Sequence, residues 1–265
     1  MAAERPKLRK REIAFALAAG ALAAGGAGAM LSIFDDDDGP PRIEQFAGPG
    51  EMTYQVGEFD EISTAGPQNV VITYGDTISV RSEGPPQALS LLEATVENGR
   101  LTIGPRSGFN WFGAGRLEGA TFYVTVPTLK GITTAGTGSV QADRIEGDRF
   151  EGMVGGPGTI SIGQLKVDQA DLTVTGSGNF VAAGDVGEAR VTVAGSGEIQ
   201  AGALRSKTAS VTIGGSGDVA LAVEEEAKVA VTGNGDVNIA GPASCSVTRM
   251  GSGDVRCNGV EMEAN

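Results

Sequence analysis

The sequence contains no histidine among its 265 residues. This absence excludes histidine general bases, Ser-His-Asp triads and histidine-ligated zinc. Only two cysteines are present, which is too few for a cysteine-only zinc site. Aromatic residues make up just 5% of the chain. Many classes of enzyme and metalloprotein are thereby excluded.

Glycine, in contrast, is abundant. The 42 glycines exceed twice the usual share, and a helical bundle or a doubly wound fold would not tolerate so many. Apolar residues make up 40% of the chain, which is enough for a substantial core. The composition therefore predicts a folded chain in which a backbone feature that needs glycine is repeated.

The net charge of −13 is distributed unevenly along the chain. Residues 1–34 carry five basic and two acidic side chains, a net of +3, which leaves −16 for residues 35–265. Because such an acidic body repels phosphates, no nucleic-acid partner is expected. The acidic surface is typical of a soluble exported protein, and the alternative is that it attracts cations or basic partners.

The N-terminal segment indicates export. Basic residues precede an apolar run at residues 13–34, and four aspartates follow it, so the body is expected outside the cytoplasm. The small residues Ala27, Gly28 and Ala29 fit a signal-peptide cleavage site, yet 22 apolar residues would also span a bilayer. Residues 1–34 are therefore a signal peptide or a membrane anchor, with membrane contact only if they are not cleaved. Residues 35–50, rich in Asp, Gly and Pro, are expected to be a tether.

A Gly-x-Gly motif recurs along the rest of the chain at steps of 18 to 20 residues. Its seven copies begin at Gly136, Gly156, Gly176, Gly195, Gly215, Gly233 and Gly251. Seven copies at a nearly constant period indicate one structural unit repeated along an axis.

Apolar residues occur at fixed positions around every motif. Those four residues after the first glycine are Val140, Ile160, Phe180, Ile199, Val219, Val237 and Val255, and a second column lies two residues further on. Alternation with period two predicts strands with one buried face. A unit of this length suits one coil of a single-stranded parallel β-helix, with short strands joined by a tight corner. We therefore expect an all-β solenoid over residues 51–261, followed by a short tail at 262–265.

The glycines have a mechanical explanation at such corners. A sharp turn needs positive φ, and a neighbouring coil leaves no room for a Cβ. A phosphate-binding loop would instead occur once, between a strand and a helix. The motifs are therefore interpreted as corners rather than ligand loops.

Three segments carry a resemblance to a known family: FDEISTAGPQNVVITYGDTISVRSEG at residues 59–84, LLEATVENGRLTIG at 91–104 and VTVPTLKGITTAGTGSV at 124–140. Together with the Gly-x-Gly-Asp coils, they resemble the family described as "putative auto-transporter adhesin, head GIN domain". The resemblance implies an exported bacterial β-helix with no established biochemical activity.

The repeat is interrupted after an early coil at Gly66. Residues 84–120 are expected to form an insertion that caps the N-terminal end of the solenoid, with a hairpin turn at 97–100 and a helical turn after Pro86. Its loop contains Phe109, Trp111 and Phe112, which either pack against the solenoid or form a partner-binding tip.

The two cysteines flank the last motif symmetrically. Cys245 lies six residues before Gly251 and Cys257 six after it, and both share the inward parity of the apolar columns. In an oxidising compartment this arrangement predicts a disulfide that clamps the last coil.

The residue after the second glycine becomes acidic towards the C-terminus, at Glu198, Asp218, Asp236 and Asp254. Stacked carboxylates must be solvated at corners, each bonding its own turn, or share cations. Calcium-binding nonapeptide repeats place their aspartate one position later and have half this period. No metal ion or other cofactor is therefore predicted.

Three functions stay open. A noncatalytic adhesion or interaction module of the cell envelope, binding an unidentified envelope protein or glycan, is favoured. A structural or signalling envelope protein is the first alternative. A polysaccharide lyase or hydrolase is disfavoured, because its best candidates, the three aspartates with Arg205 and Arg256, lie at corners rather than along a groove. No catalytic residue is predicted.

Overall fold

The computed structural model describes residues 44–48, 50–107 and 117–262. It is 72% strand and 2% helix, and it forms a parallel β-solenoid of about six turns, which confirms the predicted fold class. The apolar run at 13–34 and the aromatic side chains Phe109, Trp111 and Phe112 lie outside the described residues. Within the described ranges, no helix is long and apolar enough to cross a membrane.

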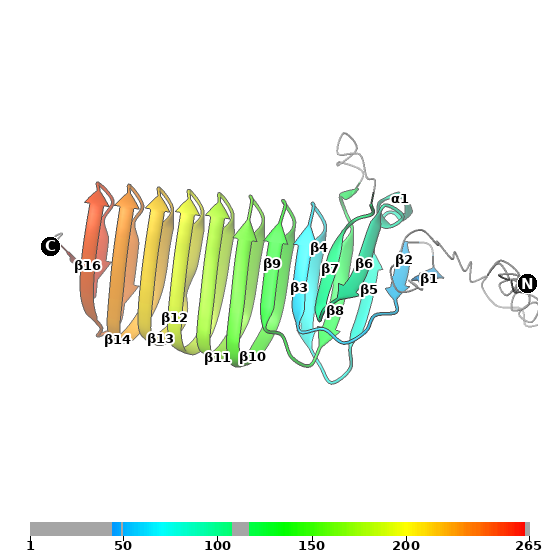
Figure 1. Ribbon diagram of the computed structural model, residues 1–265, viewed down its shortest axis with the longest axis horizontal. Coiled ribbons are helices and arrows are strands. Elements are labelled where there is room, and N and C mark those ends of the chain that lie inside the picture. Colours follow the sequence, from blue (N-terminus) through cyan, green and yellow to red (C-terminus); the bar gives the residue numbers. More distant parts are fainter. Residues whose placement is uncertain (1–43, 49, 108–116, 263–265) are drawn as a thin grey trace, which may run out of the picture. The chain divides into compact units, whose positions relative to one another are not determined.

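Five long strands form the regular part of the solenoid (Figure 1). They are β10 (Ser139–Gly155), β11 (Thr159–Gly176), β12 (Asn179–Gly195), β13 (Glu198–Gly215) and β14 (Asp218–Gly233). Each strand pairs in parallel with the next, so that Val140 lies beside Ile160, and Ile160 beside Phe180.

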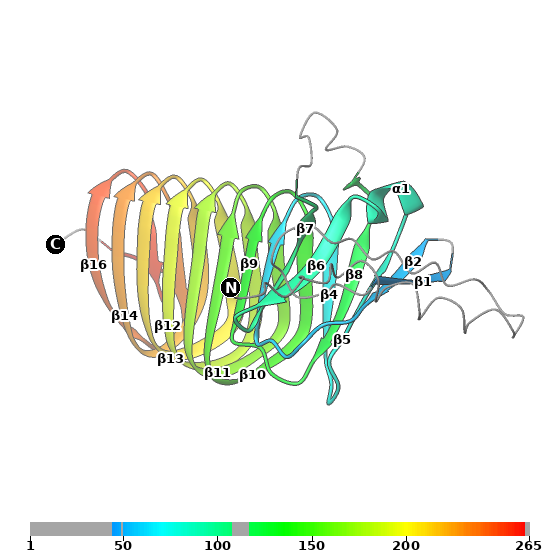
Figure 2. The same cartoon turned by 45° about the vertical axis from the view of Figure 1, so that its right-hand side comes forward.

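Each of these strands makes nearly a whole coil, whereas the repeat predicted short strands within one. Figure 2 shows the ribbons curving around the interior and breaking only at the Gly-x-Gly corner. Pairing with the neighbouring coil continues through the opposite bend, as between Glu146 and Lys166. The bend therefore does not end the strand.

The apolar columns form the core as predicted. Every residue of the column from Val140 to Val255 is at most 2% exposed. Phe180 is fully buried, and its ring occupies the space that a side chain at Gly152 would need. Gly152 is thus a packing glycine within an inward column, a role distinct from that of the corner glycines.

The two glycines of each corner serve different needs. Gly215 has φ of +132°, and a Cβ there would collide with the carbonyl oxygen of Gly195. At Gly217 a Cβ would collide with the carbonyl oxygen of Gly197. These approaches are close because the backbone N–H of Ser216 donates to Gly195 O at 2.8 Å. The corner is therefore a hydrogen-bonded stack that excludes side chains.

The early coil at Gly66 is formed by β3 (Glu61–Ala65) and β4 (Asn69–Tyr74). Its residues pair with those 70 positions later, Ile62 with Ile132 in β9 (Gly131–Ala135) and Val70 with Val140. Both halves of the early coil thus stack directly on the coil at Gly136, although 70 residues separate the two in sequence.

The intervening chain caps the opposite side of that coil. It contains β5 (Ser79–Glu83), α1 (Pro86–Leu89), β6 (Leu92–Glu97), β7 (Arg100–Pro105) and β8 (Thr121–Val126). Strand β7 pairs in parallel with β3, and β8 with β4. The first coil along the sequence, β3 and β4, therefore lies between the inserted strands β7 and β8 on one side and β9 and β10 on the other. The predicted hairpin at 97–100 is confirmed, with Asn98 and Gly99 at positive φ.

Two further strands, β1 (Glu44–Gly48) and β2 (Glu51–Tyr54), extend this end by pairing of β2 with β5. At the corner of the early coil, Gln68 stands where later corners have the second glycine of Gly-x-Gly, and the stack of corners ends there. It is 1% exposed, and its Nε2 donates to Ala65 O at 2.9 Å and to Ile103 O at 3.1 Å. Its amide nitrogen thereby satisfies one carbonyl group at the first corner and one in β7 of the cap.

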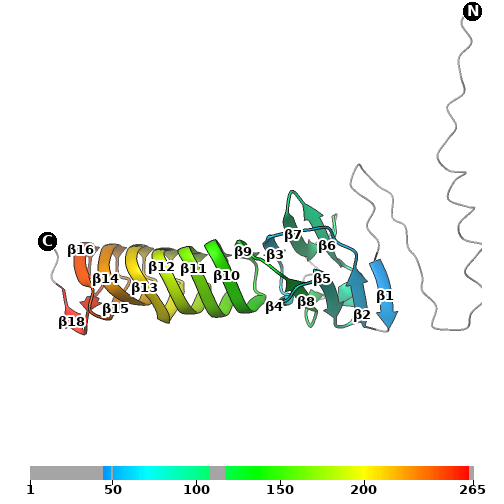
Figure 3. The same cartoon turned by 90° about the horizontal axis from the view of Figure 1, so that it is seen from below.

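The last coil is divided into shorter strands, β15 (Val237–Ala240), β16 (Ser244–Gly251), β17 (Val255–Cys257) and β18 (Val260–Glu261). Strand β18 folds back antiparallel on β17, and the N–H of Met262 donates to Val255 O at 2.8 Å (Figure 3). Met262 also packs against the core, so it helps to close this end of the interior.

Replacing a corner glycine tests this stack. We expect Gly215→Ala to lower the free energy of unfolding by about 2 kcal/mol or more, because alanine combines an unfavourable φ with a backbone collision. Gly202→Ala is the matched control on the same strand, since a Cβ there meets nothing within 4 Å; its effect should stay within about 0.5 kcal/mol. Urea denaturation measures both, and equal effects would contradict the corner model.

Candidate functional site

The acidic positions lie directly after successive corners and link one coil to the next. The N–H of Asp236 donates to Asp218 Oδ1 at 3.0 Å, and the N–H of Asp254 donates to Asp236 Oδ1 at 2.8 Å. Both carboxylates thus bond the following coil, whereas the sequence predicts a bond within their own turn. Stacking places the next backbone N–H within reach of the side chain.

An uncharged residue makes the same contact at the other end of this column. Asn69 Oδ1 accepts hydrogen bonds from Ser139 N at 3.1 Å and from Ser139 Oγ at 2.8 Å. The contact therefore needs a side-chain acceptor rather than a negative charge, and where it is absent, as at Glu198 and Asp218, the N–H donates to a glycine carbonyl group of the preceding corner instead. Glu198 precedes Asp218 in the same column.

The candidate lyase residues are not assembled into one group. Arg256 pairs with Asp254 at 3.3 Å, but Arg205 pairs with Asp185 at 2.7 Å instead of joining the aspartates. Across residues 44–48, 50–107 and 117–262, no group of three or more His, Cys, Asp or Glu side chains could hold a metal ion. The column is best explained as part of the scaffold.

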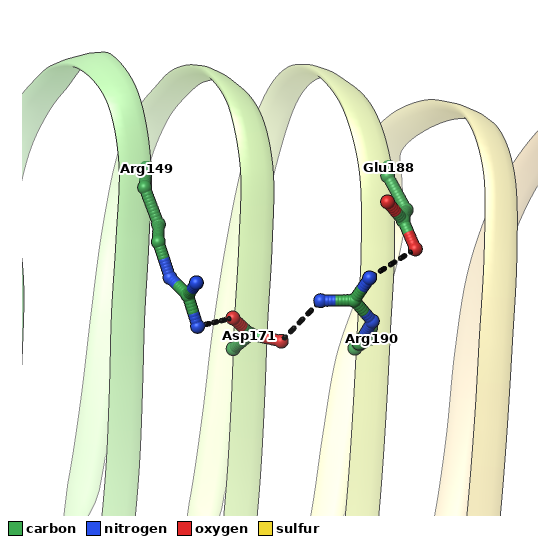
Figure 4. A network of polar contacts seen from close by, with 4 residues as sticks. All are labelled: Arg149, Asp171, Glu188 and Arg190. Carbon is green, nitrogen blue, oxygen red and sulfur yellow. Dashed lines mark hydrogen bonds and ion pairs between the residues drawn. The ribbon is translucent and has the colours of Figure 1, made fainter.

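A polar network that the sequence did not reveal crosses three coils on another face (Figure 4). Asp171 pairs with Arg149 at 2.6 Å and with Arg190 at 3.6 Å, and Arg190 also pairs with Glu188 at 2.7 Å. Asp171 lies about one coil away in sequence from both Arg149 and Arg190, so these two pairs could be found only by aligning the repeats in register. Exposed ion pairs of this kind contribute about 0–1 kcal/mol each.

Beside this network lie two outward columns without a single charged residue. The first is Thr102, Ser63, Thr133, Met153, Thr173, Thr192, Thr212, Ala230 and Thr248, and the second is Ala65, Ala135, Gly155, Thr175, Ala194, Gly214, Thr232 and Met250. We call these two columns the hydroxyl face, because nine of the seventeen residues carry a hydroxyl group. Charged residues make up 20% of the whole chain, whereas the hydroxyl face carries none over its seventeen positions.

The predicted disulfide between Cys245 and Cys257 is confirmed, with the two Cα atoms 6.4 Å apart. Cys257 is buried, whereas Cys245 is only partly buried at the start of β16. The bond joins β16 to β17, so it fixes the two halves of the last coil to each other.

Comparison with known families identifies the chain. The model of the family described as "Putative auto-transporter adhesin, head GIN domain" matches residues 58–243. The chain belongs to this family. The matched range includes the early coil, the cap and the coils as far as β15.

Solved structures of similar proteins share the GIN-domain fold. A "putative adhesin" from Bacteroides fragilis superposes with a TM-score of 0.70 at 23% identity, covering 77% of this chain and 94% of its own. A "putative lipid binding protein" from Parabacteroides distasonis gives 0.64 at 22% identity, covering 79% and 96%. A "putative adhesin" from Parabacteroides merdae gives 0.60 at 18% identity, covering 77% and 94%. At these identities the likeness establishes the fold alone. No curated protein matches the sequence.

The scaffold interpretation of the aspartates predicts that acceptor geometry matters more than charge. Asp236→Ala should lower the free energy of unfolding by about 1 kcal/mol, because the N–H of Asp254 loses its acceptor. Asp236→Asn should stay near the wild-type value, since its amide oxygen can still accept. Asp168→Ala, at an exposed aspartate outside the column, is the control. If Asn and Ala were equally destabilising, the charge itself would be required.

Removal of the disulfide should loosen the last coil selectively. We expect the double variant Cys245→Ser, Cys257→Ser to lose about 2–3 kcal/mol of stability, because a 12-residue loop is no longer closed. Hydrogen exchange should accelerate at residues 244–262 and stay unchanged in β11 and β12. Uniform acceleration over all coils would contradict a local clamp.

Proposed function

We propose that this GIN-domain protein is a noncatalytic adhesion module of the bacterial cell envelope, and that it binds its partner through the hydroxyl face. The observation that carries the proposal is the length and uniformity of that face. It extends from Thr102 to Thr248 across successive coils without a charge, while neighbouring charges such as Arg149 and Asp171 pair with one another.

The chemistry of this face favours an extended, neutral partner. Covering charged side chains without pairing them is costly, whereas threonine hydroxyls can exchange water for partner hydrogen bonds and their methyl groups add apolar contact. Equivalent positions recur at the inter-strand spacing of about 4.8 Å, so weak contacts can be made many times along one ligand. A neutral glycan chain or a flat face of an envelope protein fits these features.

The family and the N-terminal segment support an exported location. Adhesins act outside the cytoplasm, in the periplasm, the outer envelope or at the cell surface, and residues 1–34 have the pattern of a signal peptide or membrane anchor. We propose that these residues direct export and that residues 35–43 separate the folded part from the membrane or the cleavage site. The tether expected over 35–50 is shorter, because residues 44–48 form β1.

Binding to isolated envelope fractions and to a glycan array tests the proposal. Thr192→Arg and Thr212→Arg should each weaken binding at least about tenfold, because an unpaired guanidinium would be desolvated in the interface. Gln164→Arg is the matched control, since Gln164 is exposed on β11 and lies beside Arg144, in an outward column that already carries a charge. The proposal fails if the three variants bind alike, or if the purified protein cleaves a polysaccharide. Binding only to lipid vesicles would point to a lipid surface instead.

A further inference from the structure

The C-terminal coil is covered on one side only. Strand β18 pairs with β17 and covers that half of the coil. Strand β16 pairs with β14 on one edge, and no strand of the described residues pairs with its other edge (Figures 1 and 3). Within the described residues, the eight residues of β16 therefore have one unpaired edge.

The hydrogen bonds next to β16 identify its unpaired backbone groups. Ser252 N donates to Gly233 O, so Ser252 faces the preceding coil. In a parallel strand, the backbone N–H and C=O groups of successive residues point to opposite neighbouring strands. The backbone groups of Met250, Thr248 and Ser246 therefore also point towards β14. The N–H and C=O groups of Cys245, Val247 and Arg249 point away from it.

This edge lacks the usual protection against added strands. Proteins block exposed edges with proline, lysine, bulges or covering segments. β16 contains neither proline nor lysine. The guanidinium of Arg249 donates to Gly253 O at 2.9 Å and is held at the corner. Val247, in the middle of the strand, is 5% exposed and belongs to the core, so the edge is continuous with the interior.

An acidic depression adjoins the beginning of the same strand. It has a volume of about 500 Å³ and is lined by Thr208, Glu225, Glu226, Ser244, Cys245 and Ser246. Glu226 pairs with Lys228 at 3.3 Å, whereas Glu225 forms no ion pair with any of the described residues. A basic side chain placed beside Ser244 would find an available carboxylate there.

We propose that the open edge of β16 binds an extended segment of another protein as an additional strand, with a lysine or arginine of that segment beside Glu225. Unpaired backbone donors and acceptors at strand spacing select an extended polypeptide over other ligands. Alternate apolar residues of the segment would cover Val247. A second copy of the chain is disfavoured, because residues 35–265 carry a net charge of −16. The proposal does not depend on the hydroxyl face.

Synthetic peptides provide the direct test with the full-length protein. The probe is the capped peptide Lys-Thr-Val-Thr-Val-Thr-Val-Thr. The control peptide has Glu in place of Lys. We expect the Lys peptide to bind at least tenfold more tightly by isothermal titration calorimetry. Bound peptide should also slow amide exchange in β16.

Backbone methylation of the Lys peptide distinguishes strand addition from simple charge attraction. One version carries N-methyl groups on the threonines and the other on the valines. Only one set of alternate N–H groups of the added strand points towards β16. The strand cannot rotate by 180° to present the other set, because its valines would then leave the side that covers Val247. One version should therefore keep its affinity and the other should lose at least tenfold. Equal affinities for the two versions would overturn the proposal.

Protein variants locate the site. Val247→Pro should weaken binding of the Lys peptide at least tenfold, because it removes an N–H that points to the open edge and leaves the hydrogen bonds to β14 intact. Glu225→Gln should weaken it about three- to fivefold, whereas Glu224→Gln, at an exposed neighbour outside the depression, should not. The glutamine variants keep the test valid if the proline variant fails to fold. Absence of binding by the wild type, or dimerisation of the protein through β16, would overturn the proposal.

Discussion

The close approach of successive corners is the constraint on which the rest of the solenoid depends. The N–H of Ser216 donates to Gly195 O, and that of Asn234 donates to Gly215 O, each at 2.8 Å. These bonds bring the first glycine of one corner against the carbonyl group of the corner before it, where a Cβ has no room. Once the corners stack, equivalent residues of every coil form columns at the strand spacing.

The columns determine what each side chain can do. Inward positions are filled by apolar residues, and the carboxylates of Asp218 and Asp236 accept hydrogen bonds from the next coil. What is left for binding is the outer surface and the ends of the stack. The hydroxyl face arises from stacking, because its residues are far apart in sequence. The edge of β16 is continuous in sequence, and it is open because no described strand pairs with it.

Repeats predicted the regular coils well, and they predicted the cap less well. The columns around Gly66 and Gly136 were recognisable as equivalent, and the two coils pair as expected. The stacking of β7 and β8 on the far side of β3 and β4 was not predictable in the same way. Once a repeat is interrupted, the order of strands along the chain no longer specifies their order in space. Gln68, which replaces a corner glycine, marks the place where that order changes.

The sequence by itself determined the coil, the corner glycines, the inward columns and the disulfide, because each follows from local periodicity and backbone sterics. The tertiary structure alone decided which outward residues become neighbours. Residues such as Asp171 and Arg190 are adjacent only because one coil lies at strand distance from the next. It also decided that the aspartates bond across coils and that β16 is left with an open edge, since both depend on which backbone groups the neighbouring coil supplies.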